Sequence, residues 1–251
     1  TNPWYNHTYQ HVADAMAAFA VATGREYKPC EFSGHPQAER VIVLMGSAIG
    51  TCEEVIDTLL TRGEKVGVLK VRLYRPFSAM HLLSVLPKSV TKIAVLDRTK
   101  EPGALAEPLY LDVMTALAEA YSRGERATLP KVIGGRYGLS SKEFGPDCAL
   151  AIFKELTLDL PRPRFTVGIF DDVTGLSLPL TDEKIEQRAT LEALFYGLGS
   201  DGSVSATKNN IKIIGNSTSL YAQGYFVYDS QKAGGLTVSH LRISENQIKS
   251  T

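Results

Sequence analysis

Short apolar runs alternate with longer segments of helical spacing along most of the chain. Apolar positions three and four residues apart predict helices, and β-branched runs bounded by polar or glycine-containing segments predict buried strands. Strands are expected at 40–45, 65–73, 92–96, 131–133 and 165–170, and helices at 8–22, 51–60, 78–86, 104–121 and 144–156. Strands without polar alternation, separated by helices, are typical of a parallel sheet covered on both faces. The pattern therefore predicts a doubly wound, mostly parallel α/β domain.

The interval 171–185 breaks this alternation. It is rich in Asp, Thr, Gly, Ser and Pro and has no convincing periodicity, which indicates a domain boundary. Beyond it, strands are expected at 191–196, 221–228 and 236–243 and a helix at 204–214. This order is typical of the first half of a second, Rossmann-like α/β unit. We therefore divide the chain into domains at 1–190 and 191–251.

A glycine-rich motif connects the first strand of this second unit to its helix. Gly197-Leu198-Gly199-Ser200-Asp201-Gly202 reads G-x-G-x-x-G. Glycines there permit positive φ and close backbone approach, so that free N–H groups and the positive end of the helix can hold a phosphate or pyrophosphate. The alternative is a tight connection without a ligand. Only 49 residues follow Gly202, too few for the complete six-stranded fold that the motif normally opens.

Charged residues beyond the motif bear on which nucleotide it would bind. Asp229 stands where a dinucleotide-binding fold places an acidic residue against a ribose hydroxyl, which favours a nicotinamide or flavin cofactor. Lys208 and Lys232 would suit a ligand with an additional phosphate. Coenzyme A, with its pyrophosphate and 3′-phosphate, meets that description as well as NADP does. The alternative is that both lysines are ordinary solvated charges.

Other motifs give weaker signals. His7 and His11 share a helical face, but no third ligand is in view and no metal site is predicted. No local motif marks a serine or cysteine nucleophile. The run 46–50 after the first strand lacks the Lys-Ser or Lys-Thr ending of a phosphate loop, so we interpret it as a close turn.

A basic cluster follows the second strand of the first domain. Arg72, Tyr74 and Arg75 lie where this strand leaves the sheet. They form either a solvated strand end or an interface, because ligands and partners meet α/β sheets at their carboxyl edge. We expect Arg72 and Arg75 to face a neighbouring domain.

Composition excludes several classes of protein. The 27 Lys and Arg balance 27 Asp and Glu, so no net charge draws the chain to nucleic acid or to an anionic membrane. No stretch approaches the roughly 20 apolar residues of a membrane span, and no signal peptide is visible. The three scattered cysteines argue against a disulfide framework, a cysteine-rich zinc site or an iron–sulfur cluster within these residues, and they favour the cytoplasm. Without an initiator methionine, the chain is expected to be an internal piece of a longer one.

Long ordered blocks resemble the pyruvate:ferredoxin (flavodoxin) oxidoreductase family, and the resemblance covers essentially the whole chain. The blocks are Tyr5–Tyr9 (YNHTY), Gly67–Phe77 (GVLKVRLYRPF), Leu96–Gly103 (LDRTKEPG), Ile133–Phe144 (IGGRYGLSSKEF) and Gly199–Gly202 (GSDG). The resemblance implies a much larger enzyme that oxidatively decarboxylates pyruvate with thiamine diphosphate and coenzyme A. Acetyl-CoA and CO2 would be the products, and electrons would pass through 4Fe–4S clusters to ferredoxin or flavodoxin.

The same resemblance implies a division of labour. Residues 1–190 would resemble the domain that is like the C-terminal domain of transketolase, with a structural and interface role. Residues 191–251 would begin the coenzyme A-associated domain, truncated here. Thiamine diphosphate with its magnesium and the clusters would lie in other domains of the parent chain, which would be a homodimer. No catalytic and no metal-binding residue is expected in this piece.

By the resemblance, the family's coenzyme A contacts map onto Ser200, Asp201, Gly202, Ser203, Val204 and Lys232, which would form part of a site. Two alternatives stay open. The chain could be a stand-alone nucleotide-binding or assembly module without catalysis, which the length of the native gene product would test. It could also be half of an NAD-dependent dehydrogenase, for which Asp229 is the only added support.

Overall fold

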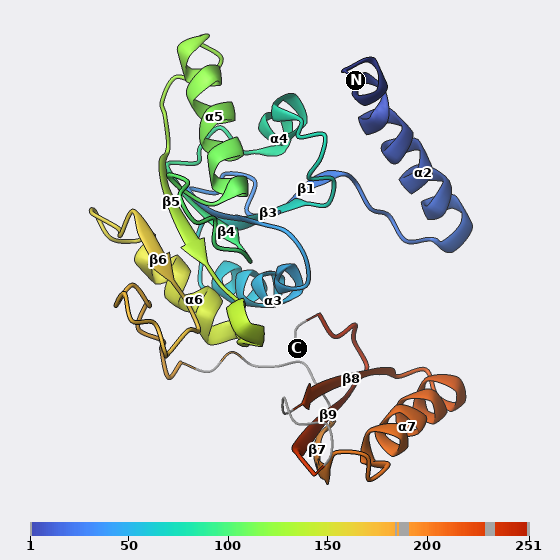
Figure 1. The fold of residues 1–251 in the computed structure, drawn as a ribbon. Helices are drawn as coiled ribbons and strands as arrows, with labels where there is room; N and C mark the ends of the chain where they lie inside the picture. The colour runs from blue at the N-terminus through green and yellow to red at the C-terminus, as the bar shows by residue number, and fades with distance from the viewer. Residues whose placement is uncertain (1, 184, 186–190, 229–233, 250–251) are drawn as a thin grey trace. The chain divides into compact units, whose positions relative to one another are not determined.

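The computed structural model describes residues 2–183, 185, 191–228 and 234–249. The chain divides into two compact units, Thr1–Ile185 and Glu186–Thr251, and each is considered by itself. The mixed α/β fold expected from the alternation of apolar runs and helices is confirmed (Figure 1).

A six-stranded sheet forms the centre of the first unit, with the strand order β1-β3-β2-β4-β5-β6. Its strands are β1 (Cys30–Gly34), β2 (Arg40–Leu44), β3 (Val66–Val71), β4 (Lys92–Asp97), β5 (Lys131–Arg136) and β6 (Arg164–Thr166). Strands β2 to β6 pair in parallel, whereas β1 pairs antiparallel with β3. Strand β3 buries all six of its residues, as a strand covered on both faces should.

Helices cover both faces of this sheet (Figure 1). The unit contains α1 (Asn2–Asn6), α2 (Thr8–Thr23), α3 (Ala48–Thr61), α4 (Ala79–Val85), α5 (Pro108–Ser122), a 3-10 turn (Leu139–Ser141) and α6 (Pro146–Glu155). Helices α3 and α6 form one core with Phe165, and α4 and α5 form the other with Leu69. Helix α5 begins four residues later than expected, because Pro108 occupies its first turn.

Two N-terminal features differ from the sequence prediction. The interval between the expected helix at 8–22 and the expected strand at 40–45, for which no element was predicted, contains strand β1, in which Cys30 is buried and the other residues are half-buried. The predicted helix at 8–22 is present as α2 and ends at Gly24, whose φ of 72° suits a glycine. However, α2 has no buried residue and lies outside the two helical layers, joined to β1 by residues 24–29 (Figure 1).

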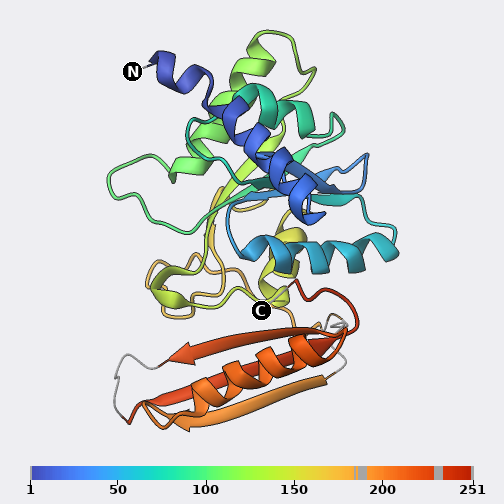
Figure 2. The same ribbon diagram turned by 90° about the vertical axis from the view of Figure 1, so that its right-hand side faces the viewer.

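The second unit contains β7 (Leu191–Leu198), α7 (Ser203–Ser217), β8 (Tyr221–Tyr228) and β9 (Leu236–Ser244). Strand β9 lies between β7 and β8 and is antiparallel to both, and α7 packs along one face of the sheet (Figure 2). The strand–helix–strand order is as expected, but the expectation of half a Rossmann-like parallel sheet is wrong. Only seven residues separate β8 from β9, too few for the crossover that a parallel pair requires.

Candidate functional site

The glycine motif forms the turn between β7 and the N-terminus of α7. Ser200 and Gly202 both have left-handed backbones, with φ of 71° and 89°. At Gly197, a Cβ atom would lie 2.0 Å from Ser203 Oγ, so the first glycine allows the start of α7 to pack against the end of β7. Packing alone therefore explains the first glycine of the motif, whether or not a ligand binds there.

The Asp201 carboxylate holds this turn together. Its Oδ2 accepts the Leu198 N–H at 2.7 Å, and its Oδ1 accepts the Ser203 N–H at 2.8 Å. Contacts from Ser203, first through its hydroxyl and then through its N–H, and from Leu198 keep the pKa of Asp201 below its usual range. Asp201 and the Ser203 N–H, both predicted to contact coenzyme A, are thus engaged with each other inside the loop.

Three other N–H groups of the predicted site belong to the turn and to the first turn of α7. Within the part of the chain that the structure describes, no acceptor contacts the N–H of Ser200, Gly202 or Val204. Val204 lies in the first turn of a 15-residue helix, where N–H groups have no intrahelical partner and the helix dipole favours anions. A phosphate oxygen is an acceptor of the kind that these groups could bind.

Of the two lysines that favoured an additional phosphate, the structure describes Lys208. Lys232, like Asp229, lies outside the described residues. Lys208 lies in α7, and its Nζ is 5.3 Å from the ring centroid of Phe226. This cation–π contact gives Lys208 a packing role, and no described contact joins it to the glycine loop.

Doubly wound sheets bind ligands at the carboxyl edge, which here lies between β2 and β4. Polar groups at this edge already form hydrogen bonds with other groups of the same chain. Asp97 accepts the N–H groups of Leu109 and Tyr110, at 2.9 and 3.2 Å, and so caps α5. Burial raises the pKa of Asp97 above its usual range. After β2, the Ile49 N–H donates to the Gly46 carbonyl at 3.3 Å, and Gly46 has φ of 83°. These contacts support the interpretation of the segment after β2 as a close turn.

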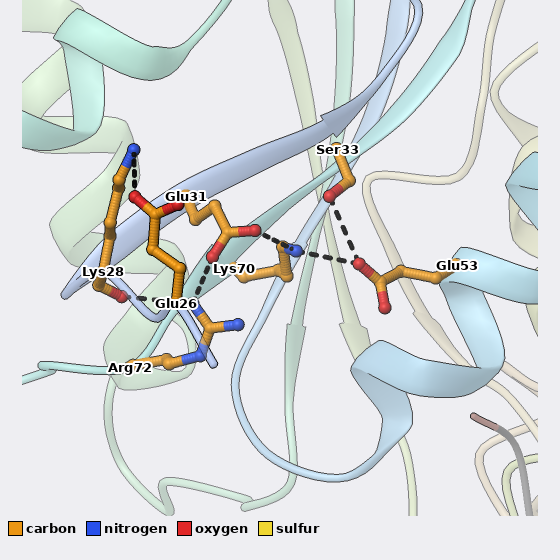
Figure 3. A network of polar contacts seen from close by, with 7 residues as sticks. All are labelled: Glu26, Lys28, Glu31, Ser33, Glu53, Lys70 and Arg72. Carbon is orange, nitrogen blue, oxygen red and sulfur yellow. Dashed lines mark hydrogen bonds and ion pairs between the residues drawn. The ribbon is translucent and has the colours of Figure 1, made fainter. Parts of the chain in front are cut away.

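A partly buried ion cluster, which sequence analysis missed, joins β1, β3 and α3 (Figure 3). Lys70 Nζ lies 2.6 Å from Glu31 Oε1 and 2.8 Å from Glu53 Oε1, and Ser33 Oγ donates to Glu53 at 3.2 Å. Arg72 Nη1 lies 2.6 Å from Glu31 Oε2. Burial raises the pKa of Glu31, but hydrogen bonds from Lys70 and Arg72 outweigh this effect and bring it below its ordinary value. The cluster fastens the edge strand β1 to the sheet.

The basic side chains after β3 mostly pair with other groups of the same chain. Besides Glu31, Arg72 donates to the Lys28 carbonyl at 3.1 Å. Arg75 pairs with Asp112 at 2.7 Å and stacks on the Tyr74 ring, with 3.8 Å to the centroid. Because the Arg75 side chain is still 53% exposed, its predicted contact with a neighbouring domain stays a prediction, whereas Arg72 is bound internally.

The remaining candidate groups lack the surroundings of a reactive site. Among the described residues, no three His, Cys, Asp or Glu side chains are grouped so that they could hold a metal ion. All three cysteines are buried, and burial raises the thiol pKa of Cys30 to about 11 and that of Cys148 to about 12. These two thiols are therefore protonated near neutral pH. No helix in the described ranges has the length and apolar character that a membrane span requires.

Comparisons with known proteins show that this chain is similar to parts of large oxidoreductases. The family described as "Pyruvate:ferredoxin oxidoreductase core domain II" matches residues 38–139, and the family "Pyruvate ferredoxin/flavodoxin oxidoreductase" matches residues 192–251. The probable pyruvate-flavodoxin oxidoreductase of Escherichia coli K12 is 77% identical over all of this chain and 21% of its own length. The pyruvate:ferredoxin oxidoreductase of Moorella thermoacetica is 54% identical over 99% of this chain and 21% of its own length.

The chain spans about a fifth of the length of the curated relatives it matches. Among solved structures, a 2-oxoglutarate:ferredoxin oxidoreductase from Magnetococcus marinus is 20% identical and covers 56% of this chain and 21% of its own, with a TM-score of 0.35.

Proposed function

Because the chain belongs to the pyruvate:ferredoxin (flavodoxin) oxidoreductase family, we propose that it is part of an enzyme that oxidatively decarboxylates pyruvate. Pyruvate and coenzyme A would give acetyl-CoA, CO2, one proton and two electrons, and the electrons would pass to ferredoxin or flavodoxin. In this proposal the six-stranded unit has a structural and interface role, and the second unit contributes part of the coenzyme A site.

One observation carries the coenzyme A assignment. The turn between β7 and α7 leaves the N–H groups of Ser200, Gly202 and Val204 without a described acceptor, at the positive end of a long helix. Asp201 stabilises the turn, because its carboxylate accepts hydrogen bonds from the N–H groups of Leu198 and Ser203. The turn therefore has its conformation before a ligand binds. The free donors would then bind pyrophosphate oxygens of the nucleotide.

Lys232 supplies the second half of the proposed site. Its ammonium group would pair with the 3′-phosphate, which coenzyme A carries and NAD does not. Further contacts would come from the remainder of the parent chain, since the loop and one lysine reach only part of so large a ligand. The site formed by this piece alone is therefore incomplete.

Thiamine diphosphate, its magnesium and the 4Fe–4S clusters are assigned to other parts of the parent chain. This assignment follows from the family resemblance, and among the described residues no three His, Cys, Asp or Glu side chains are grouped so that they could hold the magnesium. No step of the reaction is assigned to a residue of this chain. A homodimeric parent and a cytoplasmic location complete the proposal.

Two measurements on the full-length enzyme test the proposal. Under anaerobic conditions, acetyl-CoA should form from pyruvate only when coenzyme A and an oxidised ferredoxin or flavodoxin are both present. Val204→Pro removes one free N–H from the first turn of α7, where proline is tolerated, and should weaken coenzyme A binding roughly tenfold in calorimetry. Val204→Ala retains the N–H and should bind normally. Equal affinities of the two variants for coenzyme A would exclude this N–H as a contact. If Val204→Pro weakened the binding of NADH and not that of coenzyme A, the alternative of an NAD-dependent dehydrogenase would be favoured.

A further inference from the structure

Helix α2 presents an apolar face that the described part of the chain covers only in part, since Val12 and Met16 are half-buried and Phe19 is exposed. Six of its sixteen residues are alanine, Val12, Met16 and Phe19 follow one another about one helical turn apart, and no residue of the helix is buried. Apolar helices of this kind normally face a core or a partner, because leaving the apolar stripe in water forfeits its burial free energy. The incompletely covered face of α2 is therefore a place where another polypeptide surface can bind.

A groove with one fixed wall runs along this face. The α2 groove has a volume of about 690 Å³ and is lined by Thr8, His11, Val12, Ala15, Met16, Phe19, Tyr27 and Arg72. Its far wall belongs to the sheet side of the unit, because the Arg72 guanidinium lies 5.1 Å from the Tyr27 ring centroid and is held by Glu31. The groove thus lies between a helix and an anchored wall, a shape that suits an apolar segment.

Charge at the groove restricts what would bind there. The Arg25 guanidinium lies 5.0 Å from the Phe19 ring centroid, and no acidic group in the described part of the chain pairs with it. A binding segment with a carboxylate at this end would gain an ion pair as well as apolar contact. A second copy of α2 would bring one carboxylate, that of Asp14, which already accepts a hydrogen bond from Gln10.

We propose that the α2 groove binds an apolar, acidic segment of the parent polypeptide that lies outside these 251 residues. The relatives match this chain from end to end and are about five times as long. In a parent polypeptide of that length, most residues would lie outside these 251. The proposal rests on membership in a longer chain and deepens the interface role of the first unit, but it is independent of the coenzyme A site.

Site-specific photo-crosslinking in the full-length enzyme tests this proposal. A benzoylphenylalanine at position 15, in the groove, should form crosslinks to a peptide from outside residues 1–251 that carries Asp or Glu. The matched control is position 21, because Val21 is on the same helix, is 91% exposed and lines neither cavity beside α2. The proposal is overturned if position 15 yields no more crosslinks than position 21, or if its crosslinks reach only this region or its copy in the second subunit.

A pair of charge variants provides a second readout. Met16→Glu places a carboxylate in the groove, where the bound segment would otherwise bury the Met16 side chain. The variant should bind the segment more weakly, so that proteolytic cleavage of the linker 24–29 becomes roughly tenfold faster or more. Val21→Glu adds the same charge outside the groove and should leave the cleavage rate unchanged. Equal cleavage rates for the two variants would refute docking at the groove. Coenzyme A affinity, measured on the same samples, should remain as in the parent, so a failure of one proposal is distinguishable from a failure of the other.

Discussion

Replacing Lys70 with methionine tests the ion cluster that fastens β1 to the sheet. The Lys70 side chain is 5% exposed, and its Nζ pairs with Glu31 at 2.6 Å and with Glu53 at 2.8 Å. Methionine has a similar length but no charge. After the substitution, Glu53 would keep only the Ser33 hydroxyl as a hydrogen-bond donor among the described residues.

The expected cost follows from the burial of the two carboxylates. Removing one partner of a buried ion pair costs about 3–5 kcal/mol, because an uncompensated charge stays in a poorly solvated place. Glu31 keeps its contact with Arg72, and the Glu31 and Glu53 side chains are 29% and 20% exposed. We therefore expect the lower end of that range, a loss of about 3 kcal/mol in the free energy of unfolding.

Urea unfolding followed by far-ultraviolet circular dichroism measures this loss. Lys28→Met is the matched control, because the Lys28–Glu26 pair is 62% and 73% exposed and should contribute less than about 1 kcal/mol. Adding Glu53→Gln to Lys70→Met removes the uncompensated charge and should restore roughly 1 kcal/mol or more. The stabilising role of the Lys70 ion pairs is refuted if Lys70→Met costs no more than Lys28→Met, or if Glu53→Gln restores nothing.

Three further predictions concern pH and two glycines. The folded-state pKa of Glu31 lies below its ordinary value of 4.5, so its stabilising effect is complete above that pH and is lost as pH falls through the folded-state pKa. Urea unfolding across this window should show a smaller loss in Lys70→Met, and an equal loss would contradict the assignment. Gly135→Ala should destabilise by about 1–3 kcal/mol in the same assay, since its Cβ would lie 2.3 Å from Phe165 Cζ; an unchanged midpoint would show that the ring can move. Gly215→Ala, within α7 and with open space for a Cβ, should stabilise the second unit by about 0.5–1 kcal/mol, and slower amide exchange in α7 checks this.

The sequence predicts the centre of the first sheet well because its central strands are buried on both faces. Strands β2, β3 and β4 therefore appear as continuous apolar runs. Strand β1 was missed because it lies at an edge, where Glu31 and Ser33 alternate with apolar residues and give a weak signal. In the second unit, the seven residues between β8 and β9 already excluded a parallel crossover, and this length was the overlooked signal.

The candidate site was only partly predictable from the sequence. The motif correctly predicts a turn followed by a helix start, but it does not reveal that Asp201 occupies two of the donors. The ion cluster depends on partners 17 and 39 residues away from Lys70, which no local pattern connects. A lysine within the apolar run 66–71 was the available signal, because a buried ammonium group requires a counter-charge.

The most direct test of the coenzyme A assignment compares coenzyme A with dephospho-coenzyme A, which lacks the 3′-phosphate. Calorimetric titrations use the full-length enzyme and its Lys232→Ala variant. We predict that Lys232→Ala weakens coenzyme A binding roughly 10- to 100-fold and leaves dephospho-coenzyme A binding unchanged, because a charge-assisted contact is lost only where the phosphate is present. Equal effects on both ligands, or no effect on either, would contradict the assignment of Lys232 to the 3′-phosphate.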